Sequence, residues 1–301
     1  MRVLKYVVPL SCQGMTVKDF ARRELGLSAR MLTKQKLQEN GILKNGVPCR
    51  TVDILAEGDV LTFSLPEEEM HYPAEPVPLH ILWETEDYLA VEKPWGMPIH
   101  PSPGHGRDSL LNAAAYYYET TGQRLLFRPL YRLDRDTSGI VLLGKHRAAV
   151  SSAVVEKRYY AVCEGVLSGS GTIDVPIGLA PGSKILRACG SGERAVTHWE
   201  AVTAFENHTL LSLKLDTGRT HQIRAHMAYA GHPLAGDDLY GGSREHISRQ
   251  ALHCGWINLK NPALSLSITL FSEFPSDIRD AFPWLLKIRD IKREETVCPP
   301  V

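Results

Sequence analysis

The chain has 301 residues, of which 44% are apolar and 23% are charged, and its formal net charge at pH 7 is zero. This length allows two domains, or one large domain with a small satellite, and the composition is that of an ordinary folded protein. No apolar run approaches the ~20 residues of a membrane-spanning helix, and no signal-peptide pattern opens the sequence, so we expect a cytoplasmic protein without membrane association.

The cysteines and the distribution of charge give two further indications. The six cysteines are scattered and include no C-x-x-C pair, which argues against zinc ribbons and redox motifs. Cysteines placed in this way are typical of small buried side chains in an intracellular protein. Residues 1–65 contain ten Lys/Arg and six Asp/Glu, so a basic module precedes a mildly acidic body. This excess is compatible with a phosphate-bearing partner.

Residues 1–65 are predicted to form a minimal domain of two short helices and a small sheet. Apolar spacing predicts a helix over 16–25, with Thr16 as its N-cap and Asp19 completing a capping pair. A second helix is expected over 28–38. Its inward side chains are expected to be Ala29, Leu32 and Leu37.

A hairpin and a strand complete this module. Asn45-Gly46 between apolar residues predicts a tight hairpin turn, and residues 60–65 are expected to form a strand. The two helices and the hairpin also present a basic outer face. Its members are Lys18, Arg22, Arg23, Arg30, Lys34, Lys36 and Lys44.

The rest of the chain is predicted to be a second, larger domain. Residues 66–79 are rich in proline and glutamate, which is typical of a linker. From residue 80 to 290, short apolar runs alternate with turns and a few helical stretches, such as 109–120. Many strands with few helices predict an α+β domain with a large mixed or antiparallel sheet. Residues 291–301 are expected to be a C-terminal tail.

The first candidate functional segment is YRLDRDTSG, residues 131–139, which leads directly into the apolar run IVLLGK. Loops so rich in charges and hydroxyls often carry function, although a turn with exposed ion pairs has a similar pattern. The D-x-D-x-T order is also found in phosphatases that form an aspartyl-phosphate. Here the preceding residues lack the unbroken apolar strand which that class needs. A glycosidase pair is disfavoured too, because carboxylates two residues apart seldom flank a sugar ring.

The second segment is a strand, a turn and a helix over residues 211–230. Thr217-Gly218 forms the turn, and Thr220 is expected to cap the helix. Arg224 lies beside the apolar stripe of this helix, so we expect it to point into a cleft. His221 and His226 are five residues apart and project in different directions, so they cannot share a metal ion from one helix face. We expect no metal site.

The third segment is KRYYAVCEG, residues 157–165, a strand with a basic start and two tyrosines. A tyrosine ring can stack on a nucleic-acid base while its hydroxyl bonds to a neighbour. Tyrosines are also common in strands for packing reasons alone.

Together these segments resemble the RluA/RluD-type RNA pseudouridine synthases over nearly the whole chain. The family signature H-R-L-D-x-x-T-S-G is present as YRLDRDTSG, and the family's lysine-tyrosine strand as KRYYAVCEG. The most specific match is TGRTHQIRAHMAYAGHPLAGDDLYGG, and EKPWGMPIHPSPGH is similar to the family's K-P-x-G stretch. Residues 1–65 resemble the alpha-L RNA-binding domain of a ribosomal protein. One departure is Tyr131, which replaces the usual histidine and is relevant to substrate choice.

The resemblance implies roles for four side chains. Asp134, and not Asp136, aligns with the catalytic aspartate, which acts as a nucleophile at ribose C1′ or as a base at C2′. Arg132 aligns with a residue that fills the gap left by a flipped base. Tyr159 aligns with the tyrosine that lies against the target uracil and is placed to assist removal of the C5 proton. Arg224 aligns with the basic partner of the catalytic aspartate.

The expected activity is therefore cofactor-free isomerisation of uridine to pseudouridine in structured RNA, with large-subunit rRNA favoured over tRNA. No glycine-rich nucleotide loop or zinc pattern is present, in keeping with such chemistry. The basic face of the N-terminal module is expected to bind RNA phosphates, and we expect a monomer. The alternatives are an RNA-binding protein without activity and an aspartate-dependent hydrolase, which would need a metal or a second placed carboxylate.

Overall fold

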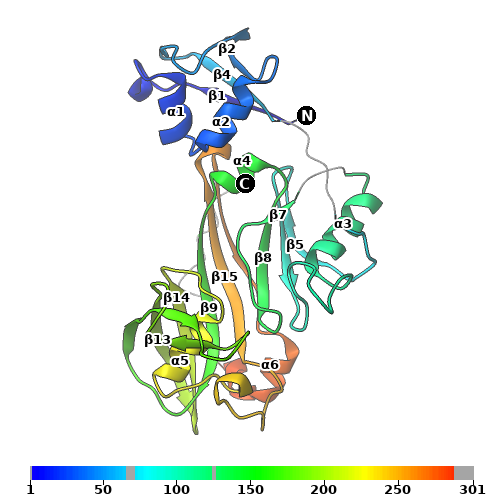
Figure 1. Ribbon diagram of the computed structural model, residues 1–301, viewed down its shortest axis with the longest axis vertical. Helices are drawn as coiled ribbons and strands as arrows, with labels where there is room; N and C mark the ends of the chain where they lie inside the picture. Colours follow the sequence, from blue (N-terminus) through cyan, green and yellow to red (C-terminus); the bar gives the residue numbers. More distant parts are fainter. Residues whose placement is uncertain (1, 66–71, 124–126, 288–301) are drawn as a thin grey trace.

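The protein is described by a computed structural model that covers residues 2–65, 72–123 and 127–287 (Figure 1). The first part of the predicted linker and the predicted C-terminal tail lie outside these described residues. The N-terminal part stands at the top of the view in Figure 1, above long strands that run down through the body.

The N-terminal part forms a small sheet with two helices. Its strand order is β1-β4-β2-β3, with all neighbours antiparallel. Asn45 and Gly46 have φ angles of 53° and 81°, which is the left-handed conformation that a tight hairpin turn between β2 and β3 requires. The elements are β1 (Arg2–Val7), η1 (Leu10–Cys12), α1 (Val17–Arg23), α2 (Ala29–Lys36), β2 (Ile42–Lys44), β3 (Val47–Pro48) and β4 (Val60–Leu65).

Both predicted helices are present, but of the three side chains expected to face inward from the second helix, only Leu32 is buried. Thr16 caps α1 as expected, since its hydroxyl accepts from the backbone N–H of Asp19 and donates to the Asp19 carboxylate. α2 ends at Lys36, and Leu37, expected to face inward, is 83% exposed. Ala29 is exposed as well. The buried side chains of α2 are Met31, Leu32 and Gln35.

The core of the N-terminal part includes side chains from the body of the protein. Ala148 and Ala263 belong to the same buried cluster as Phe20 and Met31. The Tyr6 hydroxyl donates a hydrogen bond to the backbone carbonyl of Ala263. The N-terminal part is therefore packed on the body through α4 (Arg147–Ser151) and η3 (Pro262–Leu264).

The body is built on one large sheet. The main strand order is β10-β13-β14-β9-β15-β8-β6-β5, with β16 pairing β15 and β7 pairing β8. The strands are β5 (His80–Glu84), β6 (Tyr88–Lys93), β7 (Arg128–Pro129), β8 (Ser138–Gly144), β9 (Val154–Glu164), β10 (Ser170–Asp174), β13 (Val196–Phe205), β14 (His208–Leu215), β15 (Leu252–Asn261) and β16 (Leu266–Phe271). A separate pair consists of β11 (Ile177–Leu179) and β12 (Arg187–Cys189).

The large sheet is mixed, because β8 and β15 run parallel while the other neighbouring strands are antiparallel. This confirms the expected α+β class with a mixed sheet. The parallel contact pairs Gly139 with Cys254. Gly139 has a φ angle of 121°, and an added Cβ would stand 2.3 Å from the Cys254 carbonyl oxygen, so only glycine fits there.

Few helices cover this sheet. α3 begins after its N-cap Ser109 and buries Leu110, Leu111 and Tyr118 in the main hydrophobic core. The helical elements are α3 (Leu110–Thr120), α4 (Arg147–Ser151), α5 (Gln222–Tyr229), η2 (Asp238–Tyr240), η3 (Pro262–Leu264), α6 (Ser276–Ala281) and η4 (Pro283–Lys287). Within the described ranges, no helix is long and apolar enough to cross a membrane.

Candidate active site

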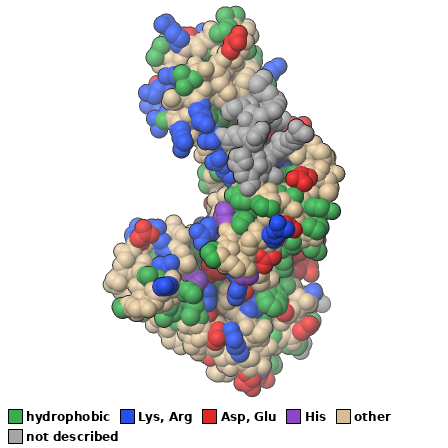
Figure 2. Space-filling view, turned by 45° about the vertical axis from the view of Figure 1, so that its right-hand side comes forward, with side chains coloured by type: hydrophobic (Ala, Val, Ile, Leu, Met, Phe, Trp, Pro, Cys, Tyr) green, Lys and Arg blue, Asp and Glu red, His purple; other side chains and the backbone are tan. Residues whose placement is uncertain are grey.

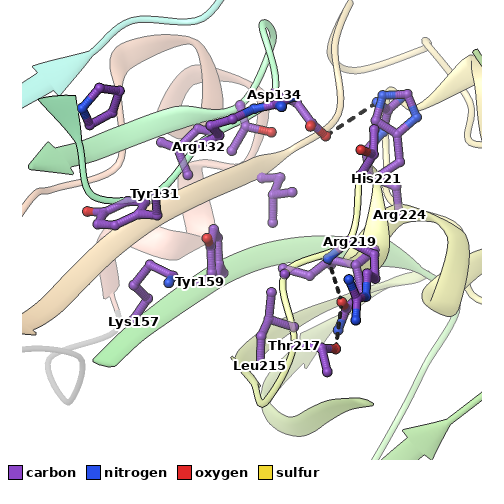
Figure 3. A pocket seen from close by; sticks show the side chains of 18 of the residues that line it. Tyr131, Arg132, Asp134, Lys157, Tyr159, Leu215, Thr217, Arg219, His221 and Arg224 are labelled. Carbon is purple, nitrogen blue, oxygen red and sulfur yellow. Dashed lines mark hydrogen bonds and ion pairs between the residues drawn. The ribbon is translucent and has the colours of Figure 1, made fainter. Parts of the chain in front are cut away.

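A hollow of about 610 Å³ lies where three segments of the body meet. It is lined by the loop before β8, by the start of β9 and by the turn that leads into α5. Arg132, Asp134, Tyr159 and Arg224, which were singled out from the sequence, all line this central hollow (Figure 3). The fold thus brings together four side chains that are spread over 93 positions of the sequence, from 132 to 224.

The loop that carries Asp134 is held by two buried basic side chains. The ammonium of Lys93 donates to the backbone carbonyl of Arg135 at 2.8 Å, and the guanidinium of Arg249 donates to that of Asp136 at 3.1 Å. Burial lowers the pKa of Lys93 to about 7, although the charges of Asp136 and Asp134 oppose the shift. A buried cation bonded to loop carbonyls limits the movement of the backbone, so the Asp134 carboxylate is held in place.

Asp134 and Arg224 face each other across the hollow (Figure 3). One guanidinium nitrogen of Arg224 lies 3.6 Å from Oδ2 of Asp134. The same guanidinium donates twice to Asp237, at 2.7 Å from Nε and 2.7 Å from the other terminal nitrogen. Burial opposes the charged form of Arg224, but the hydrogen bonds and charge of Asp237 outweigh it and raise the Arg224 pKa. Arg224 is therefore a permanent cation, oriented by Asp237 and directed at Asp134.

Tyr240 and His221 complete the surroundings of this guanidinium. The Tyr240 ring lies 5.0 Å from the guanidinium carbon of Arg224, within range of a cation–π contact. Its hydroxyl lies 3.1 Å from Nδ1 of His221. Burial lowers the pKa of His221, so the imidazole is neutral at pH 7. Asp237 thus neutralises the charge of Arg224 on one side, and the other side of the guanidinium is open to Asp134.

The turn into α5 differs from the expected one. His221, not Thr220, is the N-cap residue, and its φ angle of 56° is left-handed with no side-chain capping bond. The side-chain oxygen of Gln222 instead accepts from the Thr217 hydroxyl and from the backbone N–H of Arg219, both at 2.9 Å. Gln222 therefore fixes this turn from inside the helix, which sequence rules for N-caps do not anticipate.

Tyr159 lies on β9 in the floor of the hollow and is 6% exposed. Burial raises the pKa of its phenol well above the ordinary value, with further contributions from Cys254 and Asp134. The hydroxyl therefore keeps its proton at neutral pH. Next to it, the Lys157 ammonium lies 4.5 Å from the centre of the Tyr131 ring, and the Tyr131 hydroxyl donates to the backbone carbonyl of Ile140 at 2.9 Å.

Arg132 and Asp136 stand in contrasting surroundings. Arg132 is exposed at the rim of the hollow, and no hydrogen bond or ion pair joins its side chain to another part of the described chain. Asp136 does not line the central hollow, and the Arg135 guanidinium holds both of its oxygens, at 3.0 and 2.9 Å. Of the two neighbouring aspartates, only Asp134 reaches both the central hollow and Arg224.

Two of the histidines near the site, His221 and His226, are bonded within the protein. Nδ1 of His226 lies 2.8 Å from the Thr197 hydroxyl, and Nε2 lies 2.9 Å from the Val175 carbonyl oxygen. His100 lines the central hollow, and burial followed by the charge of Arg132 lowers its pKa. Across residues 2–65, 72–123 and 127–287, no group of three or more His, Cys, Asp or Glu side chains is placed to hold a metal ion.

The basic side chains predicted to bind RNA lie apart from this site. Six of the seven are exposed on the N-terminal part, namely Lys18, Arg22, Arg23, Arg30, Lys34 and Lys36. Lys44 is half-buried, donates to the Ile54 carbonyl and pairs with Asp59 at 3.6 Å. Figure 2 shows Lys and Arg side chains gathered on one side of this upper part. Arg30 also lines a small hollow of about 120 Å³ with Arg128 and Arg147 of the body.

Sequence reasoning missed four residues that support the site: Lys93, Asp237, Tyr240 and Arg249. The first three lie in segments that were recognised as similar to a family and Arg249 does not, but none had a distinguishing local pattern. The dipeptide Asp237-Asp238 gave no sign of which carboxylate is buried, and the structure buries Asp237 at 1% exposure. A buried acid next to a glycine-rich turn is a usable signal only when its partner is known.

Comparisons with known proteins point to one family. Residues 87–229 match the family model described as RNA pseudouridylate synthase. The Bacillus subtilis protein named uncharacterized RNA pseudouridine synthase YjbO is 43% identical over 275 residues, covering 88% of this chain and 97% of the relative. Ribosomal large subunit pseudouridine synthase D of Pseudomonas aeruginosa is 31% identical over 313 residues, covering 96% of this chain and 97% of the relative.

A solved structure gives the same result at the level of the fold. The structure of human RNA pseudouridylate synthase domain containing 1 is 25% identical and superimposes with a TM-score of 0.55, covering 67% of this chain and 86% of that one. The fold and site define an isomerase that acts on RNA. The chain belongs to the RluA/RluD-type family of RNA pseudouridine synthases.

Proposed function

We propose that this RNA pseudouridine synthase modifies uridines of large-subunit ribosomal RNA, with Asp134 as the catalytic residue. The observation that carries the proposal is the pairing of Asp134 with Arg224 at 3.6 Å in a hollow that also contains Tyr159. The RNA class is supported by the names of relatives from Pseudomonas aeruginosa, Haemophilus ducreyi and Vibrio cholerae, each called ribosomal large subunit pseudouridine synthase D.

The target uridine must leave its stack before it reaches Asp134. Extruding a base costs a few kcal/mol. Arg132 is exposed at the rim and without a bonding partner among the described residues, so its guanidinium is available to occupy the space that the base leaves. Hydrogen bonding and stacking by a planar guanidinium offset part of the cost of extrusion.

The isomerisation breaks the bond between N1 of uracil and C1′ of ribose and forms a bond between C5 and C1′. The proton lost from C5 is balanced by the proton gained at N1, so no redox partner is required. Asp134 acts at C1′ as a nucleophile or at C2′ as a base, and either role needs an ionised carboxylate. Arg224 supplies the opposing positive charge, which is effective because the site is partly shielded from water.

Tyr159 serves as the surface against which the detached uracil turns. Its ring is buried in the floor of the hollow and keeps its hydroxyl proton, since burial raises the pKa of the phenol. A neutral phenol donates hydrogen bonds well and accepts a proton poorly. We therefore assign Tyr159 to positioning the uracil, and not to removing the C5 proton.

Residues 1–65 form an RNA-binding domain in this proposal, with residues 66–79 as a linker and residues 80–290 as the catalytic domain. The exposed cations of α1 and α2 contact RNA phosphates, which adds affinity without reading sequence. The small hollow between Arg30, Arg128 and Arg147 supports a continuous phosphate path from this domain onto the body. All four central side chains belong to one chain, so the proposal is for a monomer. We also propose that it acts in the cytoplasm.

The test is pseudouridine mapping of total RNA from cells with and without the protein. We expect the loss of one or more pseudouridines from large-subunit rRNA, restored by the wild-type chain and not by Asp134→Asn. Asp136→Asn is the matched control, because this neighbouring carboxylate does not line the central hollow, and it should restore most of the modification. Loss confined to tRNA would change the substrate class, and restoration by Asp134→Asn would overturn the assignment of the catalytic residue.

A further inference from the structure

A second hollow of about 450 Å³ adjoins the central one at Asp134. Asp134, His221 and Arg224 belong to the walls of both. We call the second one the side hollow. Because the two hollows share the Asp134–Arg224 pair, anything bound in the side hollow lies one side chain away from the nucleotide that reacts in the central hollow.

The side hollow has an apolar rim that is unusual for the surface of a soluble domain. Trp95, Ile185 and Leu239 line it, and their exposed fractions are 48%, 64% and 40%. Single exposed apolar side chains are common and need no explanation, but several around one concavity mark a binding site. Trp95 is also the only one of the five tryptophans, all within the described ranges, whose side chain belongs to the exposed class.

The turn that carries Trp95 is rigid and is joined to the catalytic loop. The ammonium of Lys93 donates to the carbonyls on either side of Trp95, at 2.7 Å to Pro94 and 2.8 Å to Met97. Its third bond goes to the carbonyl of Arg135 at 2.8 Å. One buried lysine thus fixes both the turn under the indole and the loop of Asp134. An exposed indole on a fixed turn is a preorganised stacking surface, because little conformational entropy is lost when a ring stacks on it.

Two arginines of the side hollow are suited to phosphate. Arg135 and Arg244 pair with Asp136 and Asp238 at 2.9 and 2.8 Å, and the arginine side chains are 53% and 57% exposed. The Arg244–Asp238 pair is exposed on both sides, and exposed ion pairs contribute little stability, so exchanging Asp238 for a phosphate costs little. An exposed indole beside exposed arginines is the combination that binds single-stranded nucleic acid, with stacked bases and a neutralised backbone.

We propose that the side hollow binds the nucleotide next to the target uridine in the same RNA strand, with its base stacked on Trp95 and its phosphate near Arg244. This proposal rests on the proposed function, and it names a recognition site for the neighbour of the reacting nucleotide. Extrusion of the target exposes the face of the adjacent base, and the indole replaces the lost stacking partner.

The test uses the shortest rRNA stem-loop that the purified protein converts, in single-turnover reactions over a range of protein concentrations. Trp95→Ala is expected to raise the half-saturating concentration about tenfold, which corresponds to about 1.4 kcal/mol, and to change the saturated rate little. Trp95→Phe should recover most of the loss, because a phenyl ring still stacks. Tyr229→Ala is the matched control, since this tyrosine is 62% exposed but lines neither hollow.

Stem-loops with one abasic position identify the nucleotide involved. In the wild type, removing the base immediately 5′ or 3′ of the target should raise the half-saturating concentration about tenfold. In Trp95→Ala the same removal should have almost no further effect, because the two partners of one contact are not additive. The proposal would be overturned if, at both the 5′ and the 3′ position, the effect of removing the base and the effect of Trp95→Ala multiply. It would also be overturned if the Trp95→Ala variant matches the wild type.

Arg244→Ala tests the phosphate contact without altering the indole. Its binding should lose about one unit of slope in a plot of log affinity against log salt, whereas Arg279→Ala on α6 should keep the wild-type slope. An unchanged slope in Arg244→Ala removes the phosphate contact from the proposal. Failure of the proposed function is separate, because it would show as a wild-type protein that forms no pseudouridine in any RNA.

Discussion

Arg224 is bound more closely to Asp237 than to Asp134. The two bonds to Asp237 measure 2.7 Å each, whereas the contact with Asp134 is 3.6 Å. Asp237 is 1% exposed, so its charge is satisfied almost entirely by this guanidinium. Two parallel bonds between a guanidinium and a carboxylate fix the plane of the guanidinium. They therefore also fix the direction of the nitrogen that faces Asp134. Asp237 is a positioning residue for the central pair.

We predict that Arg224→Ala lowers the single-turnover rate by about 100- to 1000-fold, because Asp134 loses its opposing charge and Asp237 is left buried without a partner. Arg224→Lys should recover only part of the rate, since an ammonium cannot bond twice to Asp237 and still face Asp134. The measurement is pseudouridine formation at saturating protein. A rate near that of the wild type in Arg224→Ala would remove Arg224 from the mechanism.

Asp237→Asn should lower the saturated rate about tenfold while the half-saturating concentration of RNA stays within about twofold. The Asn side chain has one oxygen that accepts from Arg224 and an NH2 group that cannot accept, so one bond of the pair is lost while no contact with RNA changes. A purely structural role predicts loss of stability with an unchanged rate per folded molecule. Thermal unfolding of the same sample separates the two. Asp280→Asn, an exposed position on α6, is the control and should behave as the wild type.

We predict that the protein stays active after exhaustive treatment with EDTA. Free magnesium is supplied afterwards only so that the RNA folds. The histidines that a metal would need are bonded within the protein, His226 to Thr197 and the Val175 carbonyl, and His221 to Tyr240. The readout is the rate before and after treatment, with metal content measured in parallel. Activity that is lost and returns only with zinc would contradict this reading.

Local signals in the sequence predicted the local parts of this structure. The cap of α1, the Asn45-Gly46 turn and β4 at Val60–Leu65 follow from neighbouring residues alone, and all three are present. Leu37 was wrongly expected to face inward. α2 ends at Lys36, one residue before Leu37, so the helical spacing of apolar residues no longer applies to Leu37.

Contacts between distant segments could not be predicted in the same way. The parallel pairing of β8 with β15 joins residues more than a hundred positions apart, and nothing in either strand specifies its partner. The central side chains were found through resemblance to a family, which identifies residues but not their neighbours. The bonds from Arg224 to Asp237, and from Lys93 to the loop of Asp134, depend on the folded arrangement and were invisible in the sequence.

We predict a loss of stability on acidification that depends on His253. Burial lowers the pKa of this imidazole to about 4, and its ring bonds to Ser138 and to the Ser272 carbonyl. Between about pH 6.5 and about pH 4 the unfolded chain binds a proton that the folded chain does not, so the free energy of unfolding falls with falling pH by up to about 1.4 kcal/mol per unit.

Replacing His253 isolates this contribution. Urea unfolding of the wild type and His253→Gln is compared at about pH 7 and about pH 5, where the carboxylates titrate alike in both proteins. The variant should be less stable at the higher pH but should lose less stability on acidification. Equal losses in the two proteins would show that His253 does not contribute.

The last prediction concerns the N-terminal part. A chain shortened to begin at Pro76 should fold, because more than 200 residues are ample for a core of their own. Its midpoint of thermal unfolding should nevertheless fall, since Ala148 and Ala263 lose their cover and the Tyr6 bond to the Ala263 carbonyl is removed. It should still convert a short stem-loop at high protein concentration, because the central hollow lies wholly in the body.

Full-length variants show whether the lost affinity comes from phosphate contacts or from this packing. Arg22→Gln and Arg30→Gln remove exposed charges of α1 and α2 and leave the buried cluster intact. Each should reduce the slope of log affinity against log salt by about one on structured rRNA, and the shortened chain by more. Arg279→Gln on α6 is the control for a partly exposed arginine elsewhere. If all these proteins share one slope, the N-terminal part does not touch phosphate, and its contribution must come from packing on the body or from docking a protein.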